Sequence, residues 1–148
     1  MIMRFVMKAF ALAVVANSAH AAQSARLSAR IHDGTAISTS IEIKFERKVC
    51  YWERAEKKPR RLAESTCTGL LKLVAAAKAE PTEPMMPHSQ YFEISFKDAK
   101  VNWAKNTPFG LIKACDRKNE CISNEKLIAS QASLQALAQA LLKVAEQK

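Results

Sequence analysis

The four cysteines have the clearest covalent chemistry in this sequence: Cys50, Cys67, Cys115 and Cys121. They show no C-x-x-C spacing and no histidines cluster beside them, which argues against a zinc site. An even number of cysteines favours two disulfides if the chain is exported, as its N-terminal residues indicate below. Among the three pairings that four cysteines allow, we predict Cys50–Cys67 and Cys115–Cys121, because each closes a short loop. Loop entropy would make the first worth about 3 kcal/mol.

Residues suited to acid–base catalysis are few. His32 lies beside Asp33, and such a pair could act in acid–base catalysis. However, Asp33-Gly34 is a common turn sequence, which favours a structural role for these residues. His88 lies in a proline-rich loop without an adjacent acid, and no spacing singles out a carboxylate pair for glycoside hydrolysis among Glu42, Glu93 and the other acids. The G-x-S-x-G, H-E-x-x-H, P-loop and dinucleotide-binding patterns are missing from the sequence. We therefore expect a protein that is not an enzyme and uses no cofactor or metal. The alternative is a small hydrolase using His32, His88 or a carboxylate pair.

Basic residues are in excess: the chain has 23 Lys and Arg against 14 Asp and Glu, a formal charge of +9. They concentrate between Lys44 and Arg61, around the aromatic pair Tyr51-Trp52. Basic side chains beside aromatic ones can bind nucleic acid or glycan phosphates. Interleaved acids favour a solvated hairpin whose aromatic side faces the core, because charges of mixed sign are ordinary on the face of a strand. Our candidate binding residues here are Lys57, Lys58, Arg60 and Arg61.

A second candidate is the segment between Cys115 and Cys121. We predict a hairpin with Asp116 to Glu120 at its tip, so that Arg117 and Lys118 could enter an acidic cleft. A disulfide-closed loop is preorganised and binds without a large ordering cost. In this general respect the segment is similar to the cysteine-closed loops that some periplasmic lysozyme inhibitors present to their enzyme, although it shares no motif with them. The alternative is a hairpin stabilised for structural reasons alone.

The first 21 residues have the pattern of a secretory signal peptide. A start containing Arg4 and Lys8 is followed by an apolar stretch, Ala9 to Ala16, that is too short to span a bilayer. Ala19-His20-Ala21 then forms an A-x-A cleavage site, so we expect cleavage between Ala21 and Ala22. Residues 22–148 would form one periplasmic or secreted domain without a transmembrane segment. The leader holds two basic residues and no acid, which leaves a formal charge of +7 on the mature chain.

Alternating apolar and polar residues predict strands over Arg26–Gly34 and Thr35–Glu46. We expect a hairpin with the three-residue loop His32-Asp33-Gly34, which pairs Leu27 with Thr39. The second strand would continue to Trp52, and a third would return over Arg60–Cys67, so that Cys50 and Cys67 bridge neighbouring strands.

Further elements follow along the chain. We expect a short helix over about Thr68–Ala79, strands over Tyr91–Lys97 and Val101–Trp103, a break at Asn106–Pro108 and a hairpin over Phe109–Ser123. The clearest helix is the last, with an apolar stripe that Ser130 or Ser133 could precede as an N-cap. Its members are Leu134, Leu137, Ala138, Leu141, Leu142 and Ala145.

The predicted fold class is α+β: a curled antiparallel sheet of roughly five to seven strands with the C-terminal amphipathic helix packed on it. This outline resembles pleckstrin-homology-like domains, which close a bent sheet with a helix. Fold does not give function. Small size, export and missing catalytic motifs suggest a non-enzymatic binding protein with an extracytoplasmic protein partner, for example an inhibitor or immunity protein of a cell-wall hydrolase or toxin. The alternative is a basic surface that binds anionic envelope polymer, lipid headgroups or nucleic acid.

Overall fold

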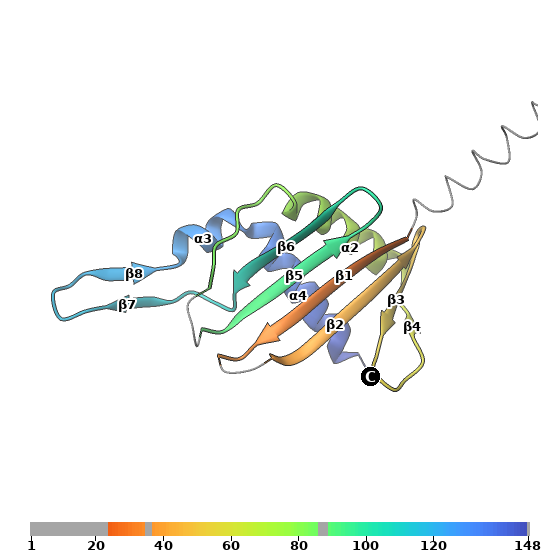
Figure 1. Ribbon diagram of the computed structural model, residues 1–148, viewed down its shortest axis with the longest axis horizontal. Coiled ribbons are helices and arrows are strands. Elements are labelled where there is room, and N and C mark those ends of the chain that lie inside the picture. The colour runs from red at the N-terminus through yellow and green to blue at the C-terminus, as the bar shows by residue number, and fades with distance from the viewer. Residues whose placement is uncertain (1–23, 35–36, 86–88, 148) are drawn as a thin grey trace, which may run out of the picture.

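The structure is a computed structural model that describes residues 24–34, 37–85 and 89–147, so that the predicted leader and His88 lie outside the described residues. A six-stranded antiparallel sheet has the order β4-β3-β2-β1-β5-β6, and β7 and β8 form a separate hairpin (Figure 1). The α+β class, the C-terminal helix on the sheet and both disulfides are thereby confirmed. The elements are β1 (Ser24–His32), β2 (Ile37–Glu46), β3 (Val49–Glu53), β4 (Arg60–Arg61), α2 (Glu64–Ala77), β5 (Tyr91–Lys97), β6 (Asn102–Pro108), β7 (Lys113–Cys115), β8 (Cys121–Ser123), α3 (Glu125–Ser130) and α4 (Ala132–Glu146).

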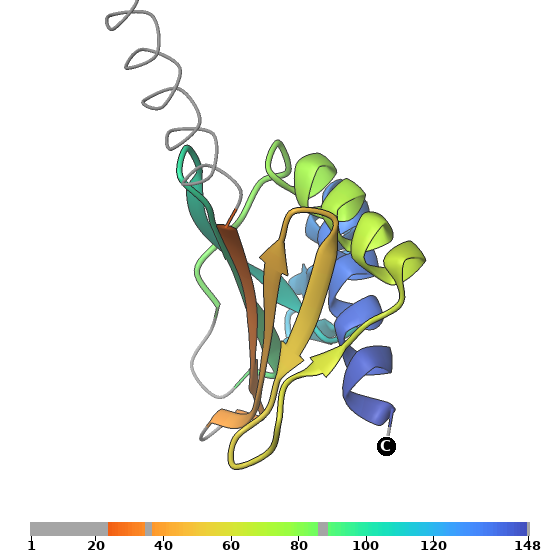
Figure 2. The same cartoon turned by 90° about the vertical axis from the view of Figure 1, so that its right-hand side faces the viewer.

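The two long helices, α2 and α4, pack against each other and cover one face of the sheet (Figure 2). The covered face carries every second side chain of the central strands, as the alternation predicts. Its fully or nearly fully buried members include Leu27, Ala29, Ile41, Ile43, Phe45, Phe92, Ile94 and Phe96. The C-terminal helix α4 packs on the sheet as predicted, and a second helix, α2, shares the same face. Among the described residues, no helix combines the length and apolar character needed to cross a bilayer.

The register of the first hairpin differs from the predicted one. Leu27 pairs with Ile43 instead of Thr39, and His32, which was predicted to lie in the loop, is the last residue of β1 and pairs with Ile37 of β2. The predicted register would have carried Ile43 and Phe45 past the start of β1, whereas the observed one places apolar side chains of both strands under the helices. Because the shift is an even number of residues, each side chain keeps its predicted face.

Strand β2 does not continue to Trp52. It ends at Glu46, and the chain reverses through Arg47 and Lys48 into the antiparallel strand β3. Arg47 adopts a left-handed conformation with φ of 61°. A turn without glycine, proline, asparagine or aspartate carries none of the usual sequence signals, which explains why it was missed.

The third strand predicted over Arg60–Cys67 is wrong beyond its first two residues. Strand β4 contains only Arg60 and Arg61, and α2 begins at Glu64, four residues before the predicted helix start. The disulfide from Cys50 to Cys67 therefore ties β3 to α2, and not to another strand. The reason is the spacing of Cys67, Leu70, Val74 and Ala77, all buried, which only a helix places on one face.

Strand β6 runs through the break predicted at Asn106–Pro108. Its last residue, Pro108, pairs with Tyr91 at the end of the strand. Because β6 is an edge strand, it has no neighbouring strand on its outer side. A proline, which has no backbone N–H, therefore removes no hydrogen bond from the sheet on that side.

The predicted C-terminal helix is confirmed as α4, but its N-terminal cap is not a serine. Ser130 donates to the carbonyl of Leu127, and Ser133 lies inside the helix. The carboxylate of Glu80, far away in sequence, accepts the N–H of Ser133 at 2.9 Å and of Leu134 at 2.7 Å. A carboxylate at this end also complements the helix dipole.

A buried polar junction joins the end of α2, the strand β6 and the start of α4. Gln131, fully buried, accepts from the Thr107 hydroxyl at 2.8 Å and donates to the carbonyls of Asn106 at 2.8 Å and Pro81 at 3.0 Å. Lys105 donates to three carbonyls at the C-terminal end of α2, including that of Ala77 at 2.9 Å. Desolvation lowers the pKa of Lys105, and the charge of Glu80 opposes that shift. These hydrogen bonds connect the sheet to both helices, so we assign the junction a structural role.

Candidate functional site

The β7–β8 hairpin stands apart from the core of the described chain. It pairs with no strand of the main sheet, and it extends from one end of the molecule beyond β6 and α3 (Figure 1). Every residue from Gly110 to Ser123 is exposed. The predicted hairpin is confirmed, with a first strand that starts at Lys113 instead of Phe109.

A disulfide and one carboxylate shape its tip. Cys115 and Cys121 face each other across the two strands and are joined to each other. The Asp116 carboxylate accepts the N–H of Lys118 at 2.8 Å and of Glu120 at 2.9 Å, and Asn119 turns the chain with a φ of 62°. Asp116 is thus occupied within the turn.

Asn124 fixes the base of the hairpin. Its side chain accepts the N–H of Ile112 at 2.7 Å and donates to the carbonyl of Gly110 at 2.9 Å. Its own N–H donates to the carbonyl of Ile112 at 3.2 Å. The hairpin is therefore held at both ends, which preorganises the exposed segment between them.

Large apolar side chains are exposed along this hairpin. Leu111 is 66% exposed, Ile112 50% and Ile122 73%, and in the described part of the chain only Ile37 joins them among large hydrophobics left this open. Ala114 pairs with Ile122, so these two side chains lie on the same face of the hairpin. Ile112 precedes Ala114 by two residues and therefore lies on that face as well. Exposed apolar residues gathered on one element mark an interaction surface. The sequence pattern singles out Arg117 and Lys118 at the tip and gives no sign that the neighbouring leucine and isoleucines are exposed.

The four cations predicted as a binding cluster occupy a different region. Lys57 and Lys58 lie in the exposed connection between β3 and β4, and Arg60 and Arg61 form β4 itself. Figure 1 places this region and the β7–β8 hairpin at opposite ends of the molecule. The structure therefore does not bring these four residues together with Arg117 and Lys118.

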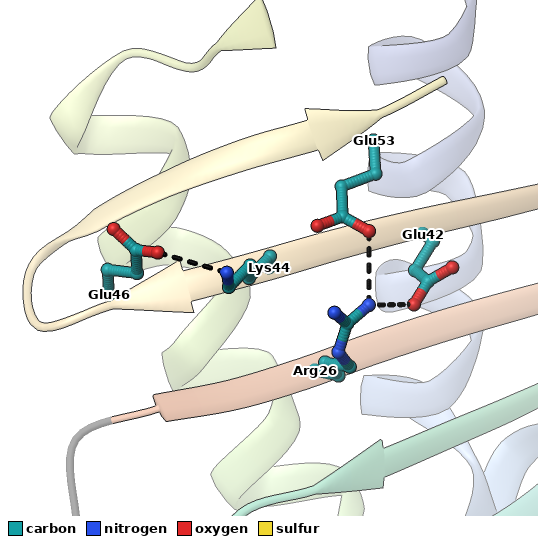
Figure 3. A network of polar contacts seen from close by, with 5 residues as sticks. All are labelled: Arg26, Glu42, Lys44, Glu46 and Glu53. Atoms are coloured by element: carbon teal, nitrogen blue, oxygen red, sulfur yellow. Dashed lines mark hydrogen bonds and ion pairs between the residues drawn. The ribbon is translucent and has the colours of Figure 1, made fainter. Parts of the chain in front are cut away.

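A network of charged residues lies on the open face of the sheet (Figure 3). Arg26 on β1 bonds to Glu42 on β2 and, at 3.0 Å, to Glu53 on β3. Glu42 and Glu53 are direct cross-strand partners, so Arg26 neutralises two carboxylates that would otherwise repel each other. The hydrogen bonds to Glu42 and Glu53, aided by their charges, raise the pKa of Arg26. Lys44 pairs separately with Glu46 at 3.1 Å.

The acid–base candidates are engaged in contacts on the same face. The His32 ring stacks on Tyr91, with centroids 4.4 Å apart, and its Nε2 lies 3.3 Å from Glu93. Glu42 is bound by Arg26, and β1 separates it from Glu93. No group of three or more metal-ligating side chains occurs among the described residues.

No protein-family model matches this sequence, and no curated protein or solved structure is significantly similar to it.

Proposed function

We propose that this chain is a non-enzymatic exported binding protein that engages another protein through the β7–β8 hairpin. An inhibitor or immunity protein of a cell-wall hydrolase or toxin is the most concrete form of this function. The observation that carries the proposal is the placement of Leu111, Ile112 and Ile122, exposed on a disulfide-closed hairpin that projects from the body. Paired cysteines and the secretory pattern of residues 1–21 support an extracytoplasmic location.

A protein partner suits this surface better than a small molecule. The hairpin is convex and presents apolar side chains along its length, with Arg117 and Lys118 at its tip. A few well-packed residues near the centre of an interface usually supply most of its binding free energy, and we assign this role to the exposed isoleucines of the hairpin. The net positive charge of the chain would also accelerate encounter with an acidic partner.

Site-specific photo-crosslinking tests the proposal. A photoreactive residue is placed at Ile122 or, as the matched control, at Ile37 on β2, which is 50% exposed. We expect position 122, and not position 37, to give an adduct with one extracytoplasmic protein in the native host.

The identified partner is then purified and its affinity measured. Ile122→Ser should weaken binding at least tenfold, because a buried isoleucine contributes about 1.5–3 kcal/mol, while Ile37→Ser should leave the affinity unchanged. Equal crosslinking from both positions, or an Ile122→Ser variant that binds normally, would refute the proposal.

A further inference from the structure

An open pocket of about 640 Å³ lies beside the connection between β3 and β4. It is lined by Ser40 of β2, by residues 52–55 and Lys57 of β3 and the following connection, and by Ala145 and Gln147 at the end of α4. It belongs to the opposite end of the molecule from the β7–β8 hairpin, so any ligand that it holds would bind independently of the proposed protein partner.

The charges around this pocket are unbalanced. Arg54 and Lys57 are its two cations, and Glu53 is its one acid among the lining residues. Glu53 is already bound by Arg26 at 3.0 Å on the open face of the sheet. No ion pair to Arg54 or Lys57 is formed within the described part of the chain, which leaves two positive charges beside the pocket without a carboxylate.

Arg54 has an incomplete set of hydrogen bonds. Its guanidinium lies over the Trp52 ring, 5.3 Å from the centroid, and its Nη2 donates to the carbonyl of Lys58 at 3.0 Å. Its Nε is buried and has no hydrogen-bond partner in the described structure. A buried N–H without a partner is costly and uncommon in folded proteins, and a bound oxyanion would supply the acceptor that this N–H lacks.

We propose that this pocket binds a phosphate group, with Arg54 and Lys57 as the binding residues. A guanidinium can present two parallel N–H donors to an oxyanion, and an ammonium adds a point charge. The two cations match a phosphate monoester, which carries a charge of about −1.5 to −2 near neutral pH, better than they match a single carboxylate. A bound phosphate would give the Arg54 Nε–H the acceptor that it lacks.

A single group is favoured over a nucleic-acid strand. Binding of single strands uses several aromatic side chains along a basic groove, on which successive bases stack. Here the pocket offers one aromatic residue, Trp52, and its ring already carries Arg54. The phosphate could be free or part of a lipid headgroup, and the experiment separates these sources.

Trp52 provides the readout. The chain has two tryptophans, so Trp103→Phe leaves Trp52 as the only indole. At constant ionic strength, inorganic phosphate should change Trp52 emission saturably, whereas chloride should not. Chemical-shift titration of the unsubstituted chain with phosphate repeats the measurement in case Trp103→Phe disturbs the fold.

Arg54→Gln and Lys57→Gln should each weaken phosphate binding at least tenfold. Lys72→Gln, which removes the same charge from an exposed position on α2, should have no effect. Replacing Cys115 and Cys121 with serine should leave phosphate binding intact, which distinguishes this site from the hairpin.

Vesicles of phosphatidic acid, whose headgroup is a phosphate monoester, and of phosphatidylcholine then identify the source. Binding to inorganic phosphate supports the site, and additional Arg54-dependent binding to phosphatidic acid vesicles assigns it to a headgroup. An equal response to chloride, an unchanged affinity in Arg54→Gln, or vesicle binding that Lys72→Gln weakens as much as Lys57→Gln would overturn the proposal.

Discussion

The two disulfides should differ sharply in what they contribute to stability. Cys50 and Cys67 are 0% and 1% exposed, belong to the hydrophobic core and connect β3 to α2. Cys115 and Cys121 are exposed and connect only the two strands of the β7–β8 hairpin. The test compares the double variants Cys50→Ala/Cys67→Ala and Cys115→Ser/Cys121→Ser.

Chain entropy sets the expected magnitudes. With a sequence separation of 17 residues, removing the Cys50–Cys67 bond should lower the free energy of unfolding by about 3 kcal/mol. In a chain of this size that loss corresponds to a fall in Tm of about 10 °C. The hairpin contributes no buried residue to the core, so opening it is not coupled to global unfolding. The Cys115→Ser/Cys121→Ser variant should therefore lose less than about 0.5 kcal/mol of its free energy of unfolding, as surface substitutions usually do.

Urea unfolding followed by tryptophan fluorescence measures both variants. Trp52 on β3 and Trp103 on β6 report on the main sheet and lie outside the hairpin. A Cys115→Ser/Cys121→Ser variant that is destabilised as much as Cys50→Ala/Cys67→Ala would show that the hairpin is part of the cooperative core. That result would contradict the separation on which the proposed binding role depends.

Three further outcomes follow from the structure. Arg26→Ala should lower the free energy of unfolding by about 1 kcal/mol because it leaves Glu42 opposite Glu53; the loss should shrink in high salt and on adding Glu53→Gln, and a salt-independent loss would contradict it. Gln131→Leu should cost about 1–3 kcal/mol in thermal unfolding, because the buried Thr107 hydroxyl loses its acceptor and the Asn106 carbonyl loses a donor, while Gln135 still donates to Thr107; an unchanged Tm would refute this role. Intact-mass analysis of protein from the native host should find a chain that begins at Ala22 and is four hydrogens lighter than its reduced form, whereas an uncut chain with free thiols would exclude the proposed export.

Local patterns predicted the parts of the fold that depend on periodicity. Alternation along β1 and β5 identified the buried faces of both strands, and the spacing of leucines identified α4. Short loop length was enough to predict both disulfide pairings. These features are encoded within about ten residues of each other or follow from chain connectivity, so a single sequence contains them.

Features that depend on distant partners were not predictable. The N-terminal cap of α4 comes from Glu80, more than fifty residues before the helix. The turn at Arg47 contains none of the residue types that usually indicate a turn. The candidate site shows the same division. The cations Arg117 and Lys118 could be noticed from their place between two cysteines, but the exposure of Ile122 depends on the absence of any helix or strand to cover it.

The β7–β8 hairpin is not needed to complete the core. The sheet and the helices α2 and α4 bury the core side chains without any residue of β7 or β8. Exposed leucine and isoleucine on a two-stranded hairpin carry a risk of aggregation, and an isolated hairpin of this size is at best marginally stable in water. A disulfide, an aspartate-bonded tip and an asparagine-bonded base nevertheless hold this one in a single shape. These bonds do not stabilise the core. They have a purpose if the hairpin binds a partner that covers its apolar face.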